Sequence, residues 1–248
     1  MTHTINTEDP VAVAVVAAIQ SGEVAQLRRL LAEHPDLATA RLGDDDPDGM
    51  SRTLLHVATD WPGHFPRVAE TITVLIEAGA DPNARFHGSH EETPLHWAAS
   101  SNDLAALDAL LDGGAEIDAP GAIIGGETAL EDARGFGNRN AAMRLIERGA
   151  SVTPDDAAGF GLQRQLQALV EGTTASQGDL DRWFWQACNG GERGTARYLL
   201  DQGADLNWIP PWEPLSPLDA ARRVGAHELA EWLTAHGGRP AQGLRRDK

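Results

Sequence analysis

Sets of polar and aromatic residues recur at four-residue spacing, and their types could perform acid/base chemistry or hold a polar ligand. Residues four apart share one face of a helix, so each set is predicted to form a stripe. The longer sets are Arg52, His56 and Asp60; Glu92, His96 and Ser100; and Asp181, Trp185 and Asn189. A shorter set consists of Glu127 and Glu131.

Two histidines and one glutamate occupy corresponding places in successive sets. Neighbouring helices in a stack lie ~8–10 Å apart, so His56, His96 and Glu131 are predicted to line up in one row. Such a row could bind a polar ligand or move protons, with Glu131, His96 and Asp60 as the candidate catalytic groups. The alternative for Glu131 is a polar pair without a chemical role.

Two short strings recur along the chain and divide it into repeats. The string Gly-Ala-Asp-Pro-Asn at residues 79–83 returns in altered form at residues 114–118, 149–153 and 203–207. Thr-Pro-Leu-His-Trp-Ala-Ala at residues 93–99 has counterparts at residues 53–58, 128–133 and 216–221. Thr93 is predicted to cap a helix whose first turn holds Pro94, and Gly79 to end a helix in left-handed geometry.

The string at residues 93–99 resembles the helix start of the ankyrin-repeat family, Thr-Pro-Leu-His-x-Ala with a period near ~33 residues. The resemblance covers nearly the whole chain. It implies an all-α solenoid of about seven helix-turn-helix repeats joined by hairpin fingers, in a single domain over residues 1–236. A flexible C-terminal tail is expected over residues 237–248. The repeats are predicted to begin near Pro10, Ser51, Glu92, Glu127, Ser151, Asp181 and Leu215.

The later repeats depart from the family pattern. The glycine string at residues 149–153 runs directly into Pro154, so the fifth repeat is predicted to lack a full hairpin finger. Residues 172–178 are small and polar, which indicates a loop before a helix that starts at Asp179. The sixth repeat therefore lacks the threonine-proline start.

The resemblance also implies which residues bind and which are structural. Contacts in ankyrin-like folds come from the residue before the helix-start threonine, from the pair after the alanines and from the finger tips, which gives a mostly acidic and aromatic concave face. The corresponding binding candidates are Asp60, Trp61, Glu92, Ser100, Ser101, Glu127, Phe136, Trp185, Asn189 and Arg223. The family's helix-start histidine makes hydrogen bonds between repeats, which favours a structural role for His56 and His96.

The seven tryptophans are unusual beside a single tyrosine. Trp61, at a contact position, and Trp185, on a stripe, are predicted to form an exposed aromatic wall. Trp208 and Trp212 flank a proline pair in a finger, where hairpin packing and ligand contact are both open. The remaining tryptophans, Trp97, Trp183 and Trp232, are expected in the core.

The composition disfavours several classes of partner. The chain has 20 Lys and Arg against 37 Asp and Glu, a formal net charge of −17, which repels nucleic acids and anionic membranes. The apolar stretch at residues 11–19 is too short to span a bilayer. Cys188 has no partner for an internal disulfide, which fits a cytoplasmic location. His64, His87 and His90 are loop histidines of unassigned role, and without a cysteine pair or a His-Glu-x-x-His helix no metal or cofactor is expected.

Two hypotheses of function follow. The first is a non-enzymatic, monomeric binding scaffold that recognises a protein partner through its concave, acidic and aromatic groove, with a basic patch on the partner favoured. The second is a small-molecule-binding protein or acid/base enzyme with its site in the groove around Glu131, His96 and Trp185.

Overall fold

A computed structural model describes residues 3–44, 49–123, 127–171 and 174–244 of the chain. The backbone divides into two compact units, Met1–Ser151 and Val152–Lys248, where the sequence predicts one continuous domain. We call them unit 1 and unit 2 and describe each by itself.

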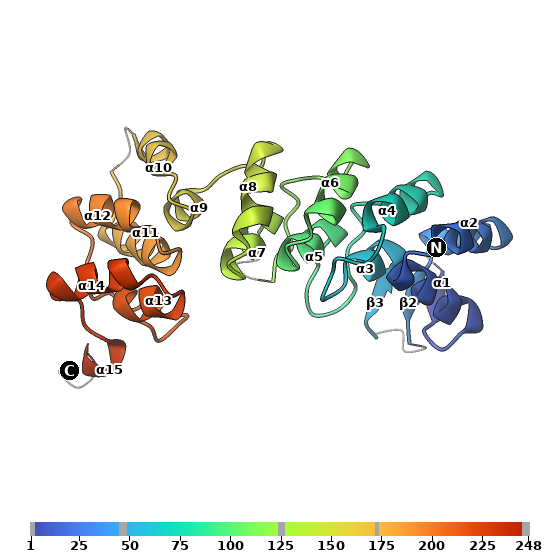
Figure 1. Cartoon of the computed structure of the whole chain (residues 1–248), viewed down its shortest axis with the longest axis horizontal. Helices are drawn as coiled ribbons and strands as arrows, with labels where there is room; N and C mark the ends of the chain where they lie inside the picture. The colour runs from blue at the N-terminus through green and yellow to red at the C-terminus, as the bar shows by residue number, and fades with distance from the viewer. Residues whose placement is uncertain (1–2, 45–48, 124–126, 172–173, 245–248) are drawn as a thin grey trace. The chain divides into compact units, whose positions relative to one another are not determined.

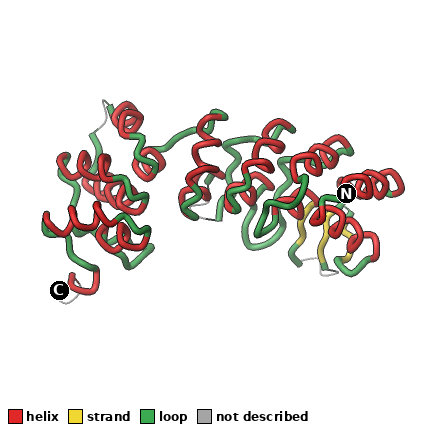
Figure 2. The backbone as a smooth tube through the Cα atoms, viewed as in Figure 1, coloured by secondary structure: helices red, strands yellow, loops and turns green. Residues whose placement is uncertain are grey.

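Unit 1 consists of stacked helix pairs with a small sheet near the N-terminus. Figure 1 shows α3 to α8 as successive pairs, and Figure 2 shows the strands in yellow. The elements are β1 (Thr4–Asn6), α1 (Pro10–Ser21), α2 (Val24–Glu33), the 3-10 helix η1 (Pro35–Thr39), β2 (Arg41–Gly43), β3 (Ser51–Thr53), α3 (Leu54–Thr59), α4 (Val68–Glu77), α5 (Pro94–Ser100), α6 (Leu104–Asp112), α7 (Ala129–Gly135) and α8 (Arg139–Glu147).

Unit 2 continues the pattern of paired helices. Its elements are α9 (Pro154–Gly159), α10 (Gln163–Val170), α11 (Gln177–Asn189), α12 (Arg193–Asp201), α13 (Pro217–Arg223), α14 (His227–Ala235) and the short α15 (Ala241–Leu244). The two units together hold seven helix pairs within the described residues, and each pair begins near a predicted repeat start. No helix among the described residues is both long and apolar enough to cross a membrane.

The recurring strings fold as the sequence predicts. Thr93 is the N-cap of α5, and Pro94 occupies its first turn. Gly79 and Gly203, in corresponding strings of the two units, have φ values of 104° and 100°, a region that favours glycine. Small side chains such as Ala98 and Ala99 are fully buried between helices, which lets the helices of neighbouring repeats approach closely.

The small sheet was not predicted. β1 pairs with β2 in parallel, β2 pairs with β3 antiparallel, and Ser51 forms an additional bridge with His87 in the finger that follows α4. Strands of three residues are too short to show an alternating pattern in the sequence. Their pairing ties the N-terminal segment to the first finger.

The fingers are unevenly distributed. Residues 78–93 and 113–128 form long connections after α4 and α6, whereas only residues 148–153 join α8 to α9. The prediction that the fifth repeat lacks a full finger is therefore confirmed. The division between unit 1 and unit 2 falls in this short connection.

Two predicted boundaries differ in unit 2. Helix α11 begins at Gln177 rather than at Asp179, because Ser176 is its N-cap and Asp179 completes a capping box with it. The second boundary is that of the expected flexible tail. Its residues up to Leu244 include α15, where buried Ala241 donates its N–H to Asp219 at 2.7 Å. Residues 245–248 lie outside the described part.

Candidate interaction site

The two helix-start histidines link three successive repeats in unit 1, those that begin with α3, α5 and α7. The Nδ1 atom of His96 accepts the backbone N–H of Thr93 at 3.1 Å, and its Nε2 atom lies 3.3 Å from the carbonyl oxygen of Glu127. His56 repeats the arrangement, with Nε2 3.1 Å from the carbonyl oxygen of Glu92. Each carbonyl belongs to the residue just before the next helix cap, so one side chain fixes two repeats.

The histidines are neutral at physiological pH. Both side chains are fully buried. Burial lowers the pKa of His56 to about 3 and the pKa of His96 to about 4, and the hydrogen bonds to the carbonyls of Glu92 and Glu127 only partly offset it. With Nδ1 accepting and Nε2 donating, both ring nitrogens are engaged in structural bonds. This geometry supports the structural interpretation and leaves His96 without access to a substrate.

The candidate carboxylates near this row are close to arginines. Glu131 occupies the place of the histidine in α7, with its side chain 13% exposed and its Oε1 atom 3.4 Å from Arg134. Asp60 pairs with Arg52. These contacts fit the interpretation of Glu131 as a polar pair, and they reduce the negative charge that Asp60 presents.

Glu92 and Glu127 precede the helix caps in successive repeats, yet their environments differ. Glu92 is buried, and this burial raises the pKa of its carboxyl group, while a side-chain hydrogen bond with Trp97 lowers it. Glu127 is exposed. Glu92 therefore offers little surface to a partner, and Glu127 stays available.

Two exposed aromatic residues lie at the ends of neighbouring helices in unit 1. Helices α3, α5 and α7 pack side by side, and Trp61, Ser101 and Phe136 follow their C-terminal ends in corresponding places. Trp61 is 83% exposed and Phe136 is 51% exposed. We call these three residues the aromatic edge. The prediction that Trp61 is exposed is confirmed.

Hydrogen bonds hold the aromatic edge in place on both sides of α5. The ring Nε2 atom of His64 lies 3.0 Å from the carbonyl oxygen of Ser101, and its backbone N–H donates to Asp103 at 2.6 Å. From the other side, the Asn138 amide donates to the carbonyl oxygens of Ala99 and Ser100. His64 thus has a positioning role that the sequence did not assign.

The prediction that Trp185 forms part of an exposed aromatic wall is wrong. Its side chain is 3% exposed, and its Nε1 atom donates to the carbonyl oxygen of Leu215 at 3.0 Å. Leu215 precedes the N-cap of α13, so the indole makes the link that histidines make in unit 1. Trp185 thus holds the repeat position that was predicted, but its side chain links two repeats and is not available to a partner.

The exposed tryptophan of unit 2 is Trp212, in the finger before α13. It is 54% exposed and packs edge-on against Trp185 and Trp208, with ring centres 6.1 and 5.6 Å apart. Beside this finger, Arg223 donates to Asn189 at 2.6 Å and pairs with Glu213. Asn189 and Arg223 are therefore neighbours, as their corresponding repeat positions predict.

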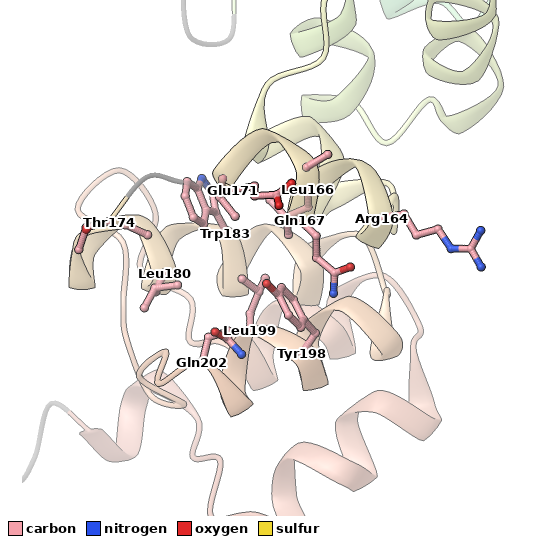
Figure 3. A pocket seen from close by; sticks show the side chains of 13 residues that line it. Arg164, Leu166, Gln167, Glu171, Thr174, Leu180, Trp183, Tyr198, Leu199 and Gln202 are labelled. Atoms are coloured by element: carbon pink, nitrogen blue, oxygen red, sulfur yellow. The ribbon is translucent and has the colours of Figure 1, made fainter.

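A cavity of about 760 Å³ in unit 2 was not predicted from the sequence. Side chains of α10, α11 and α12 line it, as Figure 3 shows, with Leu166, Trp183 and Tyr198 among them. Trp183 is 6% exposed, and its Nε1 atom has no acceptor among the described residues. Its core location is as predicted. The cavity depends on the distance between α10 and α12, which no local pattern encodes.

The other loop histidines show no metal site. His87 and His90 are exposed, and the main chain of His87 pairs with Ser51. Among the described residues, no group of three or more His, Cys, Asp or Glu side chains is placed to hold a metal ion.

Comparison with known proteins places this architecture in a family. A family model of ankyrin repeats in three copies matches residues 68–156. The structure also matches the ankyrin repeat domain of human ASB11, with a TM-score of 0.54 and 20% identity, over 91% of this chain and 98% of that one. The chain contains ankyrin repeats and has the fold of an ankyrin-repeat domain. Ankyrin-repeat domains generally act as scaffolds for protein interaction.

Curated relatives share the repeats over part of their length. Human SH3 and multiple ankyrin repeat domains protein 2 is 33% identical over 158 residues, which are 57% of this chain and 8% of that protein. Protein fem-1 homolog A from Rattus norvegicus is 39% identical over 79 residues, 28% of this chain and 12% of that protein. This ankyrin-repeat chain therefore spans only a small part of the relatives it matches.

Proposed function

We propose that this ankyrin-repeat chain is a binding scaffold whose unit 1 recognises a protein partner through its concave face, anchored at the aromatic edge. The observation that carries the proposal is the 83% exposure of Trp61 at a contact position of the repeat. Tryptophan is enriched among the residues that dominate binding energy at protein interfaces. Covering a large apolar ring that is exposed to water contributes a large favourable free energy of binding.

The aromatic edge is fixed before any partner arrives. His64 and Asn138 hold the loops that carry Trp61 and Phe136 against the end of α5. A binding surface that is already ordered loses less conformational entropy on association. We therefore infer that the partner places apolar side chains over Trp61 and Phe136, on either side of Ser101.

Charge is proposed to act mainly on the rate of association. The chain carries a formal net charge of −17, which attracts a basic partner from a distance. At the site itself, the contacts of Asp60 with Arg52 and of Glu131 with Arg134 limit the negative charge available for direct contacts. Added salt should thus slow binding more than it speeds release.

The alternative, a small-molecule site or acid/base enzyme around Glu131, His96 and Trp185, has less support. His96 and Trp185 are buried, and a ring nitrogen of each is bonded to a main-chain carbonyl. Glu131 is the group that separates the two proposals. Glu131→Gln should leave protein docking nearly unchanged, whereas proton-transfer chemistry would lose ~10²–10⁴ in rate.

The test begins with partner identification. A photoreactive phenylalanine analogue at position 61 should crosslink a partner that the same analogue at position 144, on α8, does not capture. With the purified partner, Trp61→Ala and Phe136→Ala should each raise Kd by about 30-fold, or roughly 2 kcal/mol. Arg144→Ala should bind like the parent. Normal affinity of both aromatic variants together with impaired binding by Arg144→Ala would refute the site.

A further inference from the structure

Two half-buried arginines in unit 1 differ from all the others. Six arginines of the described chain are half-buried. Four of them contact a carboxylate within 4.0 Å, namely Arg52, Arg134, Arg144 and Arg182. Arg41 and Arg85 form no such pair within the described residues, although the chain has an excess of acidic residues.

The hydrogen-bond partners of these two guanidinium groups, within the part of the chain that the structure describes, are all neutral. Arg41 donates from Nε to the Ser51 hydroxyl at 2.8 Å, and from Nη2 to the carbonyl oxygens of Ser51 and Arg85, both at 2.7 Å. Arg85 donates from Nη1 to the carbonyl oxygens of Glu91 and Pro120. The Nη1 atom of Arg41 and the Nε and Nη2 atoms of Arg85 have no acceptor among the described residues.

Both arginines line one cavity of about 470 Å³. Its walls come from η1, β2 and β3 on one side and from the finger at residues 79–91 on the other. Arg41 donates to the main chain of Arg85, so the two residues are in direct contact within the wall of this cavity. A cavity of this size accommodates a small metabolite.

A half-buried charge that no described carboxylate pairs with is energetically unfavourable. Burial lowers the pKa of Arg41, which shows that its charge is partly removed from water. The charge of Arg41 also lowers the pKa of buried His56, and that of Arg85 lowers the pKa of His96. A half-buried cation without a counter-charge favours binding of an anion that supplies one.

We propose that this cavity binds the oxyanion group of a small molecule, a carboxylate or a phosphate, between Arg41 and Arg85. The Nε and Nη2 atoms of Arg85, which have no acceptor among the described residues, form a fork that matches both groups through paired hydrogen bonds, and Nη1 of Arg41 can donate one more. This site lies at the first finger and is separate from the proposed protein-binding edge.

Two carboxylates at the cavity carry the charge opposite to that of the arginines, so their removal is the matched test of the proposal. Asp81 and Glu91 are exposed, line the same cavity, and form no ion pair within 4.0 Å in the described structure. Each repels an anion that enters. Removing one of these charges should therefore strengthen binding of the oxyanion, while removing an arginine weakens it.

The experiment is calorimetric titration of the full chain at low ionic strength with inorganic phosphate and, separately, with succinate. Saturable binding of one probe to one site is expected, and the probe that binds identifies the group as phosphate or carboxylate. Arg85→Gln should weaken that binding at least ~10-fold, the loss of one charged hydrogen-bonding group. Asp81→Asn should tighten it about 2-fold to 5-fold. Arg29→Gln, at an exposed arginine of α2, should change nothing.

Folding is checked by thermal melting of each variant. If Arg85→Gln unfolds, Asp81→Asn and Glu91→Gln decide the matter, because both change exposed side chains. The proposal is overturned if neither probe saturates the parent by ~10 mM, beyond the ~1 mM Kd of a weak site. It is equally overturned if folded Arg85→Gln binds like the parent, or if Asp81→Asn fails to tighten binding.

Discussion

The two units connect successive repeats with different chemistry at one position. In α3 and α5 of unit 1, the third helix residue is a histidine, His56 or His96, and its ring nitrogen bonds to the carbonyl before the next cap. In unit 2, Trp185 makes that bond. Asp219, the third residue of α13, makes a bond of opposite direction, because its carboxylate accepts the N–H of Ala241. Side chains of different chemistry thus make this link to the next repeat, although Glu131 at the same place in α7 pairs with Arg134 of its own helix.

The fingers give a second contrast between the units. In unit 1 the finger after α4 reaches the small sheet through His87 and helps to form the cavity that contains Arg41 and Arg85. Unit 2 has a long finger at residues 202–216, but only residues 171–176 join α10 to α11. The larger cavity of unit 2 lies between α10 and α12. The cavity of unit 1 is thus lined by a finger, and the cavity of unit 2 by the second helices α10 and α12 of two repeats.

The largest expected effect concerns the indole link in unit 2. Trp185→Ala should lower the free energy of unfolding by ~3–5 kcal/mol, because it removes a large buried ring. Trp185→Phe keeps most of the volume but leaves the Leu215 carbonyl without its donor, which should cost about 1–3 kcal/mol. Urea unfolding measures both, with exposed Trp212→Ala as a control that loses much less. A Trp185→Phe variant as stable as the parent would show that the link contributes nothing.

Acid should weaken unit 1 before unit 2. Burial lowers the pKa of His56 to about 3 and that of His96 to about 4, so both stay neutral in the folded chain while unfolded histidine takes up protons below about 6.5. The unfolded state then binds more protons, and stability falls as the pH drops from about 7 to about 4. Each histidine accounts for up to ~1.4 kcal/mol per pH unit. The raised pKa of Glu92 acts in the opposite direction.

Hydrogen exchange at several pH values separates the two units. Amides of α5 should lose protection between about pH 7 and about pH 5, the range in which histidine titrates. Amides of α11 should not, because its capping residue Asp179 has a pKa held below its usual range by Ser176. His96→Gln should flatten the pH dependence of the whole chain. Equal acid sensitivity of α5 and α11 would contradict the contrast.

A smaller effect is expected where the units are alike. Gly79 and Gly203 both end a helix at positive φ, and no atom lies closer than 3.9 Å to the place that a Cβ atom would take. Gly79→Val and Gly203→Val should therefore each cost ~1 kcal/mol or more, from backbone strain alone. Gly243→Val, within the C-terminal α15, should cost almost nothing. Thermal melting compares the three, and identical melting temperatures for Gly79→Val and Gly243→Val would disprove the helix-ending role of Gly79.

The smallest effect is expected for the exposed aromatic of unit 1. Trp61→Ala should change the free energy of unfolding by less than about 0.5 kcal/mol, because a surface residue loses few contacts. Its counterpart Trp185→Ala should be strongly destabilising. Urea unfolding of both variants tests whether burial of the tryptophan determines how much stability each one loses. A large loss of stability for Trp61→Ala would make any loss of binding by that variant uninterpretable.

The sequence by itself determined the repeats, because their signals are local. The capping threonine, the following proline and the left-handed glycine act within a few residues of one helix. Their recurrence, together with the helix starts near Pro10 and Asp181, predicted the seven helix pairs that the described residues form and the missing finger after α8. The exposure of Trp61 also followed from its place in the repeat. The start of α11 was misplaced because the capping box of Ser176 and Asp179 was not recognised.

Only the tertiary structure decided which of the chemically suitable side chains are accessible. Trp61 and Trp185 both occupy candidate contact positions. Trp61 is exposed to water, whereas Trp185 is buried and bonded to the next repeat, because burial depends on which elements pack against each helix. Arg41 and Arg85 come from a strand and a finger that meet through long-range pairing. That no described carboxylate pairs with either arginine is a result of folding, because it depends on which side chains the fold brings close to them.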